Sequence, residues 1–273
     1  MTAAPTLTAA APVRRARVVD RHRQAVFAVR LAVIAVVLVI WQVNPGHFLP
    51  SYAFGRPTTV ASELWDLITS GKIFRQIGAT ALSVAYAMII ALPVGVAAGL
   101  LSRVRFVDWV LEPIVTLLYA VPKLGVISLL ILILGVNGKA HVALVVLTIV
   151  FIYYYATRQA VQDVDQRQVT AMRLMGASTF KIGRSLLLPS SVPHLLAATR
   201  IALPLALAFE IFAEIVVPAG GSGLGVILGI YQNNADPSGS VAIMLVGALL
   251  GYLLSVVLGR YIEKYTKSIG SGI

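Results

Sequence analysis

The chain of 273 residues is 58% hydrophobic and only 12% charged, and its 22 basic and 11 acidic side chains give a net charge of +11. Soluble globular domains carry charge on about 25% of their residues, so this composition excludes that class and predicts one integral membrane domain. The basic side chains flank apolar runs, which argues against a nucleic-acid-binding protein. The absence of cysteine excludes disulfides and thiolate metal sites, and the four histidines (His22, His47, His141, His194) lack ligand spacing and are expected at interfaces or in loops.

The first 75 residues predict a tail, a first membrane span and a short helix. Residues 1–26 form a basic tail, and the apolar run 27–43 follows it. A cleaved signal peptide has the same order of charge and hydrophobicity, but 17 apolar residues are long for it and no small-x-small cleavage pattern follows, which favours an uncleaved span. Within the unit 27–75, Thr58 or Thr59 is the expected N-cap of a short periplasmic amphipathic helix that ends near Ile68.

The core, residues 76–265, predicts five further spans, and residues 266–273 form a C-terminal tail. About 20 apolar residues cross a bilayer, and such segments cover 77–101, 110–136, 141–155, 195–217 and 241–261. Gly95 and Gly99 have the small-xxx-small spacing that lets two helix backbones pack closely. The Tyr153-Tyr-Tyr155 run is expected in an interfacial aromatic belt, and the Gly-rich segment 218–239 in a re-entrant or surface hairpin.

The third segment, 110–136, is interrupted at Pro122-Lys123. Proline removes a helical hydrogen bond, and irregular backbone at membrane depth is tolerated only where it is buried in protein or lines a watery cavity. The break therefore predicts a position that is either buried in protein or beside a watery cavity.

The distribution of basic residues predicts the orientation. Sixteen of the 22 lie in the N-terminal tail, the second-to-third loop, the fourth-to-fifth loop and the C-terminus, and only four lie in the opposite loops. Basic residues concentrate on the cytoplasmic side, so both termini are expected in the cytoplasm.

The fourth-to-fifth loop, residues 157–190, is amphipathic and basic. Between residues 164 and 181 apolar side chains alternate at helical spacing with polar ones, and Gly176 divides them, which predicts two short helices at a glycine hinge. Such an insert fits either a docking element for a partner or an interfacial helix on anionic lipid.

The order of residues in this loop resembles the cytoplasmic loop of bacterial ABC importer permeases. That family's pattern is Glu-Ala-Ala, three residues, Gly, nine residues, an aliphatic residue, two residues and Pro. It falls here on Thr170, Ala171, Met172, Gly176 and Leu186, and Pro189 closes it. Thr170 replaces the motif's Glu and Met172 its second Ala, so a salt bridge made by that Glu is not possible here.

The resemblance covers most of residues 48–265 and is most similar to the nitrate, sulfonate, taurine and bicarbonate branch. It includes the segments 48–71, 118–122, 134–137 and 189–202, and the residues Ala213-Glu214 and Gly223-Leu-Gly225 further on. Lys123, Pro204 and Glu210 depart from the family pattern.

The resemblance implies an all-α polytopic protein of about six transmembrane helices in the bacterial cytoplasmic membrane, with a coupling-helix loop. It implies two ATP-binding subunits that hold ATP and Mg, a second permease chain, identical or homologous, and a substrate-binding protein, with no cofactor or metal in this chain. The residues expected to dock on the ATPase are Thr170, Ala171, Met172, Arg173, Gly176, Ala177, Lys181 and Pro189, and those expected at the path or gate are Tyr119, Pro122, Lys123, Glu210 and Glu214.

Two alternatives place the function in this chain alone. Glu210 and Glu214 lie one helical turn apart, and intramembrane acids are typical of ion-coupled secondary transporters or, less often, intramembrane enzymes. No nucleotide-binding motif is present, because residues 135–140 lack the P-loop spacing, so ATP hydrolysis is assigned to another chain. Since a lone intramembrane charge is costly, Lys123 is expected either to pair with Glu210 or Glu214 or to bind an anionic solute.

Overall fold

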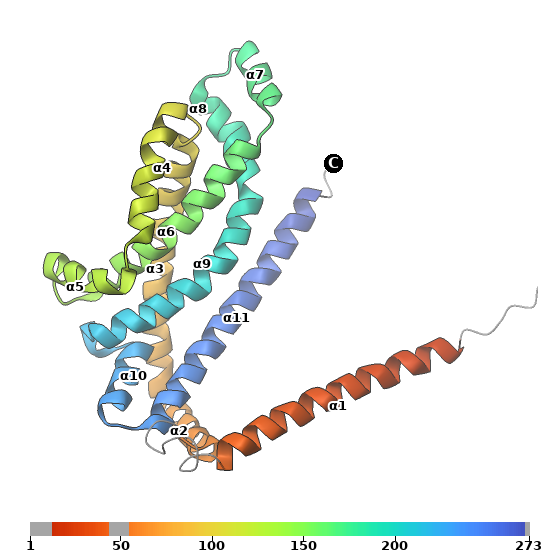
Figure 1. Ribbon diagram of the computed structural model, residues 1–273, viewed down its shortest axis with the longest axis vertical. Coiled ribbons are helices and arrows are strands. Elements are labelled where there is room, and N and C mark those ends of the chain that lie inside the picture. Colours follow the sequence, from red (N-terminus) through yellow and green to blue (C-terminus); the bar gives the residue numbers. More distant parts are fainter. Residues whose placement is uncertain (1–12, 44–54, 271–273) are drawn as a thin grey trace, which may run out of the picture.

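The structure is a computed structural model that describes residues 13–43 and 55–270. Within these residues every regular element is a helix, which confirms the predicted all-α class (Figure 1). In chain order the elements are α1 (Val13–Val43), α2 (Pro57–Thr69), α3 (Lys72–Leu101), α4 (Arg105–Ala120), α5 (Lys123–Leu134), α6 (Gly138–Asp163), α7 (Gln166–Leu174), α8 (Thr179–Ile182), the π-helical turn η1 (Gly183–Leu187), α9 (Leu188–Val216), the 3-10 turn η2 (Ala219–Gly221), α10 (Leu224–Asn233) and α11 (Pro237–Gly270).

Among the described residues, five helices are long and apolar enough to cross a membrane, and the bent pair α4 and α5 adds a sixth crossing if it counts as one span. The predicted spans are therefore present, and each of them begins before its predicted apolar run. The predicted tails are partly helical, since α1 begins at Val13 and α11 ends at Gly270; residues 1–12 and 271–273 lie outside the described residues.

The core of the bundle is formed where α3, α6 and α9 pack together. The face of α3 that meets α6 carries small side chains and ends in Gly95 and Gly99. A Cβ atom at Gly95 would lie 2.6 Å from Cβ of Tyr153, and one at Gly99 would lie 2.5 Å from Cβ of Thr157. The glycine pair thus sets the close approach of α3 and α6, as its spacing predicts.

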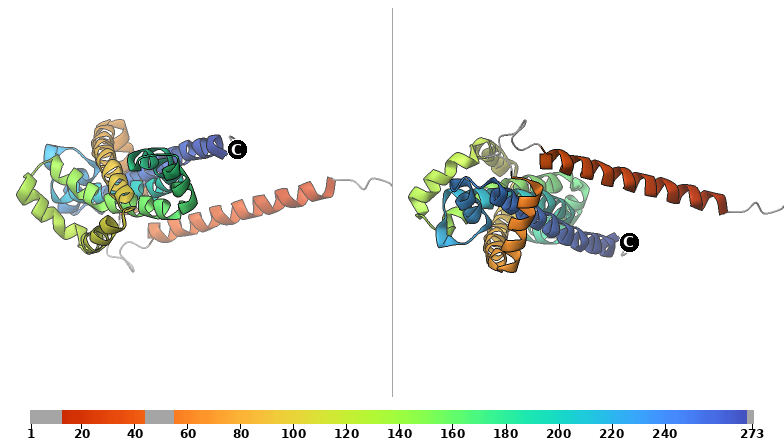
Figure 2. Two further views of the ribbon diagram at one scale, coloured as in Figure 1. Left: turned by 90° about the horizontal axis from the view of Figure 1, so that it is seen from above. Right: turned by 90° about the horizontal axis from the view of Figure 1, so that it is seen from below.

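Helix α1 extends away from this core (Figures 1 and 2). None of the side chains in its apolar stretch Val26–Val43 is fully buried. Near its end, Trp41 Nε1 donates a hydrogen bond to the carbonyl oxygen of Gly55 at 2.9 Å. Its apolar side chains are available to lipid or to another chain.

Helix α2 begins earlier than the sequence predicts. Arg56 is the N-cap and Pro57 the first helical residue, so the prediction of Thr58 or Thr59 as the N-cap is wrong. Proline is pre-organised for the first helical position, which moves the start of the helix. The Thr59 hydroxyl lies inside the first turn, where it accepts a hydrogen bond from the Arg56 amide at 3.1 Å.

The tyrosine run also differs from its predicted place. Tyr153 and Tyr154 are 1% and 2% exposed, in the packed core instead of an interfacial belt, and Tyr155 is half-buried. Helix α6 is covered on several sides by α3, α9 and α5, so even its bulky side chains are enclosed.

The Gly-rich segment folds back against the bundle. Its helix α10 has ten residues and is about 15 Å long, too short to cross a membrane. It packs against α9, α11 and α3 at the end of the bundle opposite α7 and α8 (Figure 1).

Candidate functional site

Helices α7 and α8 form a hairpin that projects from one end of the bundle (Figure 1). Asp165 caps α7 by accepting a hydrogen bond from the Arg167 amide at 2.8 Å, and Ser178 caps α8 by accepting one from the Lys181 amide at 3.3 Å. Between them Gly176 has a φ of 78°, a left-handed conformation that glycine adopts without strain. The two short helices and the glycine hinge match the sequence prediction.

A small hydrophobic cluster holds the hairpin on the bundle. Its buried members are Val161, Val169, Ile182 and Leu187, and Met172 and Ala177 are among the half-buried side chains around them. Met172 and Ala177 therefore face the bundle, whereas the other predicted docking residues are exposed: Thr170, Ala171, Arg173, Gly176, Lys181 and Pro189.

The hairpin also carries large apolar side chains that are mostly exposed. Leu174, Met175 and Phe180 are 85%, 77% and 78% exposed. In the sequence they stand out as apolar residues near Gly176 in a polar stretch, but the docking prediction did not include them. An exposed apolar surface of this kind is typical of a contact with another protein.

The hairpin is joined to the membrane by continuous helix. From Thr179 to Val216 the chain runs through α8, η1 and α9 as 38 helical residues without a gap. The hairpin is thus connected through α9 to the far end of the bundle, where Glu210 and Glu214 lie.

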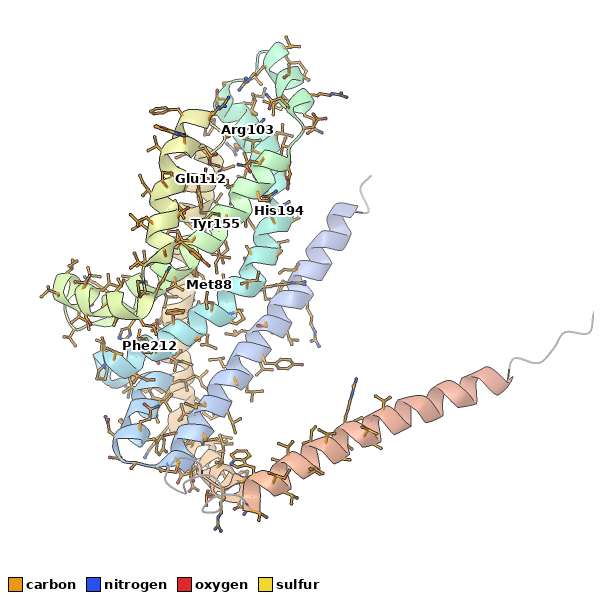
Figure 3. The ribbon with its side chains drawn as sticks, in the orientation of Figure 1. Met88, Arg103, Glu112, Tyr155, His194 and Phe212 are labelled. Atoms are coloured by element: carbon orange, nitrogen blue, oxygen red, sulfur yellow. The ribbon has the colours of Figure 1, made fainter. Side chains whose placement is uncertain are left out.

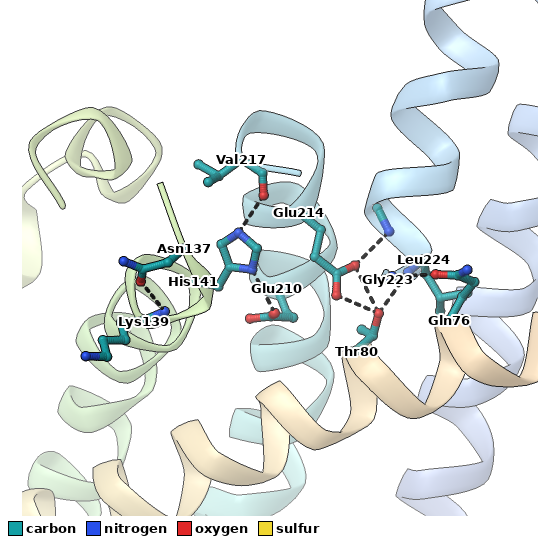
Figure 4. A network of polar contacts seen from close by, with 11 residues as sticks. Gln76, Thr80, Asn137, Lys139, His141, Glu210, Glu214, Val217, Gly223 and Leu224 are labelled. Carbon is teal, nitrogen blue, oxygen red and sulfur yellow. Dashed lines mark hydrogen bonds and ion pairs between the residues drawn. The ribbon is translucent and has the colours of Figure 1, made fainter. Parts of the chain in front are cut away.

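Glu214 joins three helices at that end (Figure 4). The Thr80 hydroxyl, on α3, lies 2.7 Å and 2.9 Å from the two Glu214 carboxylate oxygens, to which it donates, and the Gly225 amide donates to Oε2 at 2.7 Å. Thr80 in turn accepts a hydrogen bond from the Leu224 amide at 2.9 Å. The carboxylate therefore caps the N-terminus of α10, where backbone amides lack helical partners and the helix dipole favours negative charge.

The glycines around Glu214 allow this contact. Gly223 has a φ of 144°, and a Cβ atom there would overlap the Glu214 carboxyl group. A Cβ atom at Gly225 would overlap the carbonyl of Ile211 on α9. The residues Ala213-Glu214 and Gly223-Leu-Gly225 thus form one structural unit.

Glu210 lies one turn earlier on α9 and is fully buried beside His141. Its Oε1 is 3.5 Å from His141 Nδ1, and His141 Nε2 donates a hydrogen bond to the Val217 carbonyl at 2.6 Å (Figure 4). His141 is only 3% exposed, so its expected interfacial or loop position is wrong. Nothing in its sequence spacing indicates this pairing, because Glu210 is 69 positions away.

The third hydrophobic segment bends by 96° between α4 and α5. Pro122 is the N-cap of α5, which confirms the predicted break, and Lys123 begins the helix. The Lys123 amine donates to the Tyr119 carbonyl and lies 4.6 Å from the Tyr119 ring and 5.6 Å from the Phe151 ring. These are favourable cation–π distances.

The predicted ion pair of Lys123 with Glu210 or Glu214 is not formed in the described part of the chain. Each acid is held by other partners, His141 for Glu210 and Thr80 with Gly225 for Glu214. The bend carries Lys123 onto the aromatic side chains of α4 and α6 instead.

Helix α4 is fixed to α6 by a half-buried ion pair. Arg158 donates from Nε and Nη2 to the two carboxylate oxygens of Asp108, at 2.6 Å and 2.9 Å, and Nη2 lies 3.2 Å from Glu112. Glu112, Arg103 and Tyr155 lie toward the hairpin end of the bundle (Figure 3). The ion pair therefore fixes α4, the first half of the broken span, against α6.

Known proteins match most of this chain. Residues 91–268 match the family described as "Binding-protein-dependent transport system inner membrane component". The nitrate import permease protein of Leptolyngbya laminosa is 28% identical over 82% of each chain. The bicarbonate transport system permease protein of Synechocystis is 26% identical over 86% of each chain, and an aliphatic sulfonates transport permease protein of Bacillus subtilis is 25% identical over 79% of each.

Two solved structures show the same fold. A chain of a bacterial ABC transporter for alginate import aligns with a TM-score of 0.64 at 12% identity, covering 91% of this chain and 99% of that one. A chain of the inward-facing methionine transporter MetNI aligns with a TM-score of 0.59 at 21% identity, covering 74% and 97%. From the match over residues 91–268, this chain belongs to the binding-protein-dependent ABC transporter permeases, whose members are non-catalytic, multi-pass subunits of the bacterial inner membrane.

Proposed function

We propose that this chain forms one half of the translocation path of an ATP-driven importer for a small anionic solute. In this proposal two permease chains, identical or homologous, enclose the path, two ATP-binding subunits hold ATP and Mg, and a binding protein delivers the solute. Both termini and the α7–α8 hairpin lie in the cytoplasm, in keeping with the sixteen basic residues on that side. Family membership makes an ion-coupled transporter or an intramembrane enzyme the weaker alternative.

The observation that carries the proposal is the exposed apolar surface of Leu174, Met175 and Phe180 on a hairpin continuous with α9. In water such side chains favour a protein partner that buries them. Docked there, an ATP-binding subunit would move the hairpin, and α8, η1 and α9 would carry that motion through the membrane. One hairpin engages one such subunit, which supports a complex with two permease chains.

Replacing Gly176 with tryptophan is expected to block docking. The φ of 78° disfavours any side chain except asparagine, and the indole would stand among the exposed docking residues. The permease should remain folded in the membrane while its ATP-binding subunit no longer copurifies. Interface hot spots contribute about 2 kcal/mol or more, so affinity should fall at least about 30-fold.

The matched control is Gly176→Asn, which retains the left-handed conformation with a small side chain and should keep the complex. Phe180→Ser tests the apolar surface itself and should weaken docking without backbone strain. If the tryptophan variant assembles and couples ATP hydrolysis to transport at the normal rate, the hairpin is not the docking site.

For the path we propose Tyr119, Pro122 and Lys123 at the break between α4 and α5. Lys123 has no carboxylate partner among the described residues and lies against aromatic rings. The relatives named for nitrate, bicarbonate and sulfonates support an anionic solute. Glu210 and Glu214, which are 0% and 2% exposed, would act on the path indirectly by fixing α9 and α10 around it.

Replacing Lys123 with methionine is expected to raise the transport KM about tenfold or more while leaving complex assembly intact. Removal of a charge that binds an anion costs on the order of 1.5–3 kcal/mol of affinity. Lys123→Arg should retain most of the affinity because it keeps the charge. Lys139→Met, at an exposed lysine on α6, is the control and should transport normally. Wild-type kinetics in Lys123→Met would make Lys123 an interfacial anchor.

A further inference from the structure

A groove of about 930 Å³ lies at the hairpin end of the bundle, between the end of α3 and the run from α8 to the start of α9. Much of its wall is aliphatic: Leu100, Leu101, Val104, Leu187 and Leu188. Leu101 and Val104 are 56% and 48% exposed at the end of a membrane-spanning helix. The groove thus opens where apolar helix surface gives way to charged side chains, which is the level of a lipid head group.

Four arginines line the same groove, and no acidic residue does: Arg103, Arg105, Arg173 and Arg184. The Arg103 side chain is already hydrogen-bonded within the protein, because it donates to the Val161 carbonyl at 3.0 Å and to the Gln166 side chain. Arg105, Arg173 and Arg184 are exposed, and their side chains have no hydrogen-bond or ion-pair partner among the described residues. Three unneutralised guanidinium groups around one groove favour an anion, and guanidinium binds phosphate in a bidentate manner.

We propose that this groove binds one anionic phospholipid, with its phosphate among Arg105, Arg173 and Arg184 and an acyl chain along Leu101, Val104 and Leu188. Basic pockets between membrane helices bind anionic head groups, and the aliphatic wall supplies the apolar surface that a free anion does not use. The occupant is a lipid rather than the ATP-binding subunit, because of the three large apolar docking residues only Phe180 lines the groove. Leu174 and Met175 are left for the protein partner.

This site goes beyond the proposed function, although Arg173 and Phe180 belong both to the hairpin and to the wall of the groove. It would place an anionic lipid against α8 and η1, the helical connection between hairpin and α9.

Native mass spectrometry of the detergent-purified permease–ATPase complex tests the proposal. Phosphatidylglycerol, phosphatidylcholine and inorganic phosphate are titrated separately. We expect one tightly bound phosphatidylglycerol for each permease chain, at least about tenfold weaker phosphatidylcholine binding, and no displacement of the lipid by millimolar phosphate. Displacement by phosphate would reduce the site to a free-anion site and overturn the proposal, as would equal binding of the two lipids.

Two variants address the two halves of the groove. Arg105→Gln with Arg184→Gln should lower phosphatidylglycerol affinity at least about tenfold, whereas Lys72→Gln with Arg75→Gln, which removes two exposed charges near the start of α3, should not. Gly183→Leu adds a side chain where no atom lies within 4 Å of a Cβ position, so it should fill the groove, and weaken lipid binding, without changing charge. Full lipid retention in either groove variant overturns the proposal, and so does loss of the lipid on assembly with the ATP-binding subunit, which would assign the groove to the protein interface.

Discussion

Replacing Gly95 with leucine is expected to prevent α3 from packing on α6 and so to prevent stable folding of the bundle. A Cβ atom at this position would lie 2.6 Å from Cβ of Tyr153, 2.7 Å from the Val150 carbonyl oxygen and 3.0 Å from the Tyr154 amide nitrogen. Two of these three atoms belong to the backbone of α6, which cannot relieve the clash by rotating about a side-chain bond. The helices would have to separate along their most extensive contact.

The cost should be large because lipid does not supply a hydrophobic force that drives the helices together again. Association of helices in a membrane rests on close packing of small residues. Overpacking of a tight core costs about 1–3 kcal/mol for a few added methylenes, and the leucine side chain exceeds that. We expect the thermal unfolding midpoint of the purified variant to fall by roughly 10 °C, or the variant to fail to accumulate in the membrane. Loss of monodispersity in detergent on heating measures the midpoint.

Gly78→Leu is the matched control on the same helix. No atom lies within 4 Å of a Cβ position at Gly78, which is exposed. The variant should be as stable as the wild type or slightly more stable, because glycine inside a helix costs about 0.5–1 kcal/mol relative to alanine. Equal stability of Gly95→Leu and wild type would show that α3 and α6 do not meet as closely as described.

Features encoded by local sequence could be predicted. Apolar length predicts the spans, Pro122 the bend, Gly176 the hinge, and the spacing of Gly95 and Gly99 their packing. Each depends on one segment and on a rule that acts within a few residues. The family resemblance placed Glu214 and Gly225 in one sequence element, but it did not predict the hydrogen bond between them.

Contacts between helices could not be predicted from their separate sequences. Tyr153, Tyr154 and His141 are polar-tipped side chains on an apolar helix, a pattern equally consistent with an interfacial belt. Their burial follows from the many helices that surround α6, which sequence periodicity does not reveal. The expected pairing of Lys123 with an acid failed for the same reason, since the direction of the 96° bend decides which side chains Lys123 meets.

The exposed surface of the hairpin was predicted only in part. The motif directed attention to residues around Gly176, including Met172 and Ala177, which face inward. Leu174, Met175 and Phe180 lie between the motif positions, and their exposure depends on which side of the hairpin the hydrophobic cluster covers. A motif fixes the positions of residues along the chain, whereas packing against the bundle decides which of their side chains remain exposed.

Loss of the Glu214 carboxylate is expected to release α10 from α9 and α3. In Glu214→Leu the Gly225 amide and the Thr80 hydroxyl lose their acceptor at a position where Glu214 is 2% and Thr80 0% exposed. Each unsatisfied buried group costs about 1–3 kcal/mol, so this variant should be among the least stable. Glu214→Gln keeps one acceptor oxygen and should be destabilised less. Asp66→Asn, an exposed acid on α2, is the control and should match the wild type.

A double-mutant cycle between Thr80 and Glu214 tests whether the three helices are held as one unit. Thr80→Val removes both the donor to Glu214 and the acceptor of the Leu224 amide, so part of its cost is shared with Glu214→Gln. The double variant should then be more stable than the sum of the single effects by about 0.5–3 kcal/mol. Stability against unfolding and solute transport should decline together across the cycle, because a displaced α10 alters the end of α9. Additive stabilities, with transport lost in Glu214→Gln at wild-type stability, would instead place the carboxylate in direct contact with the solute.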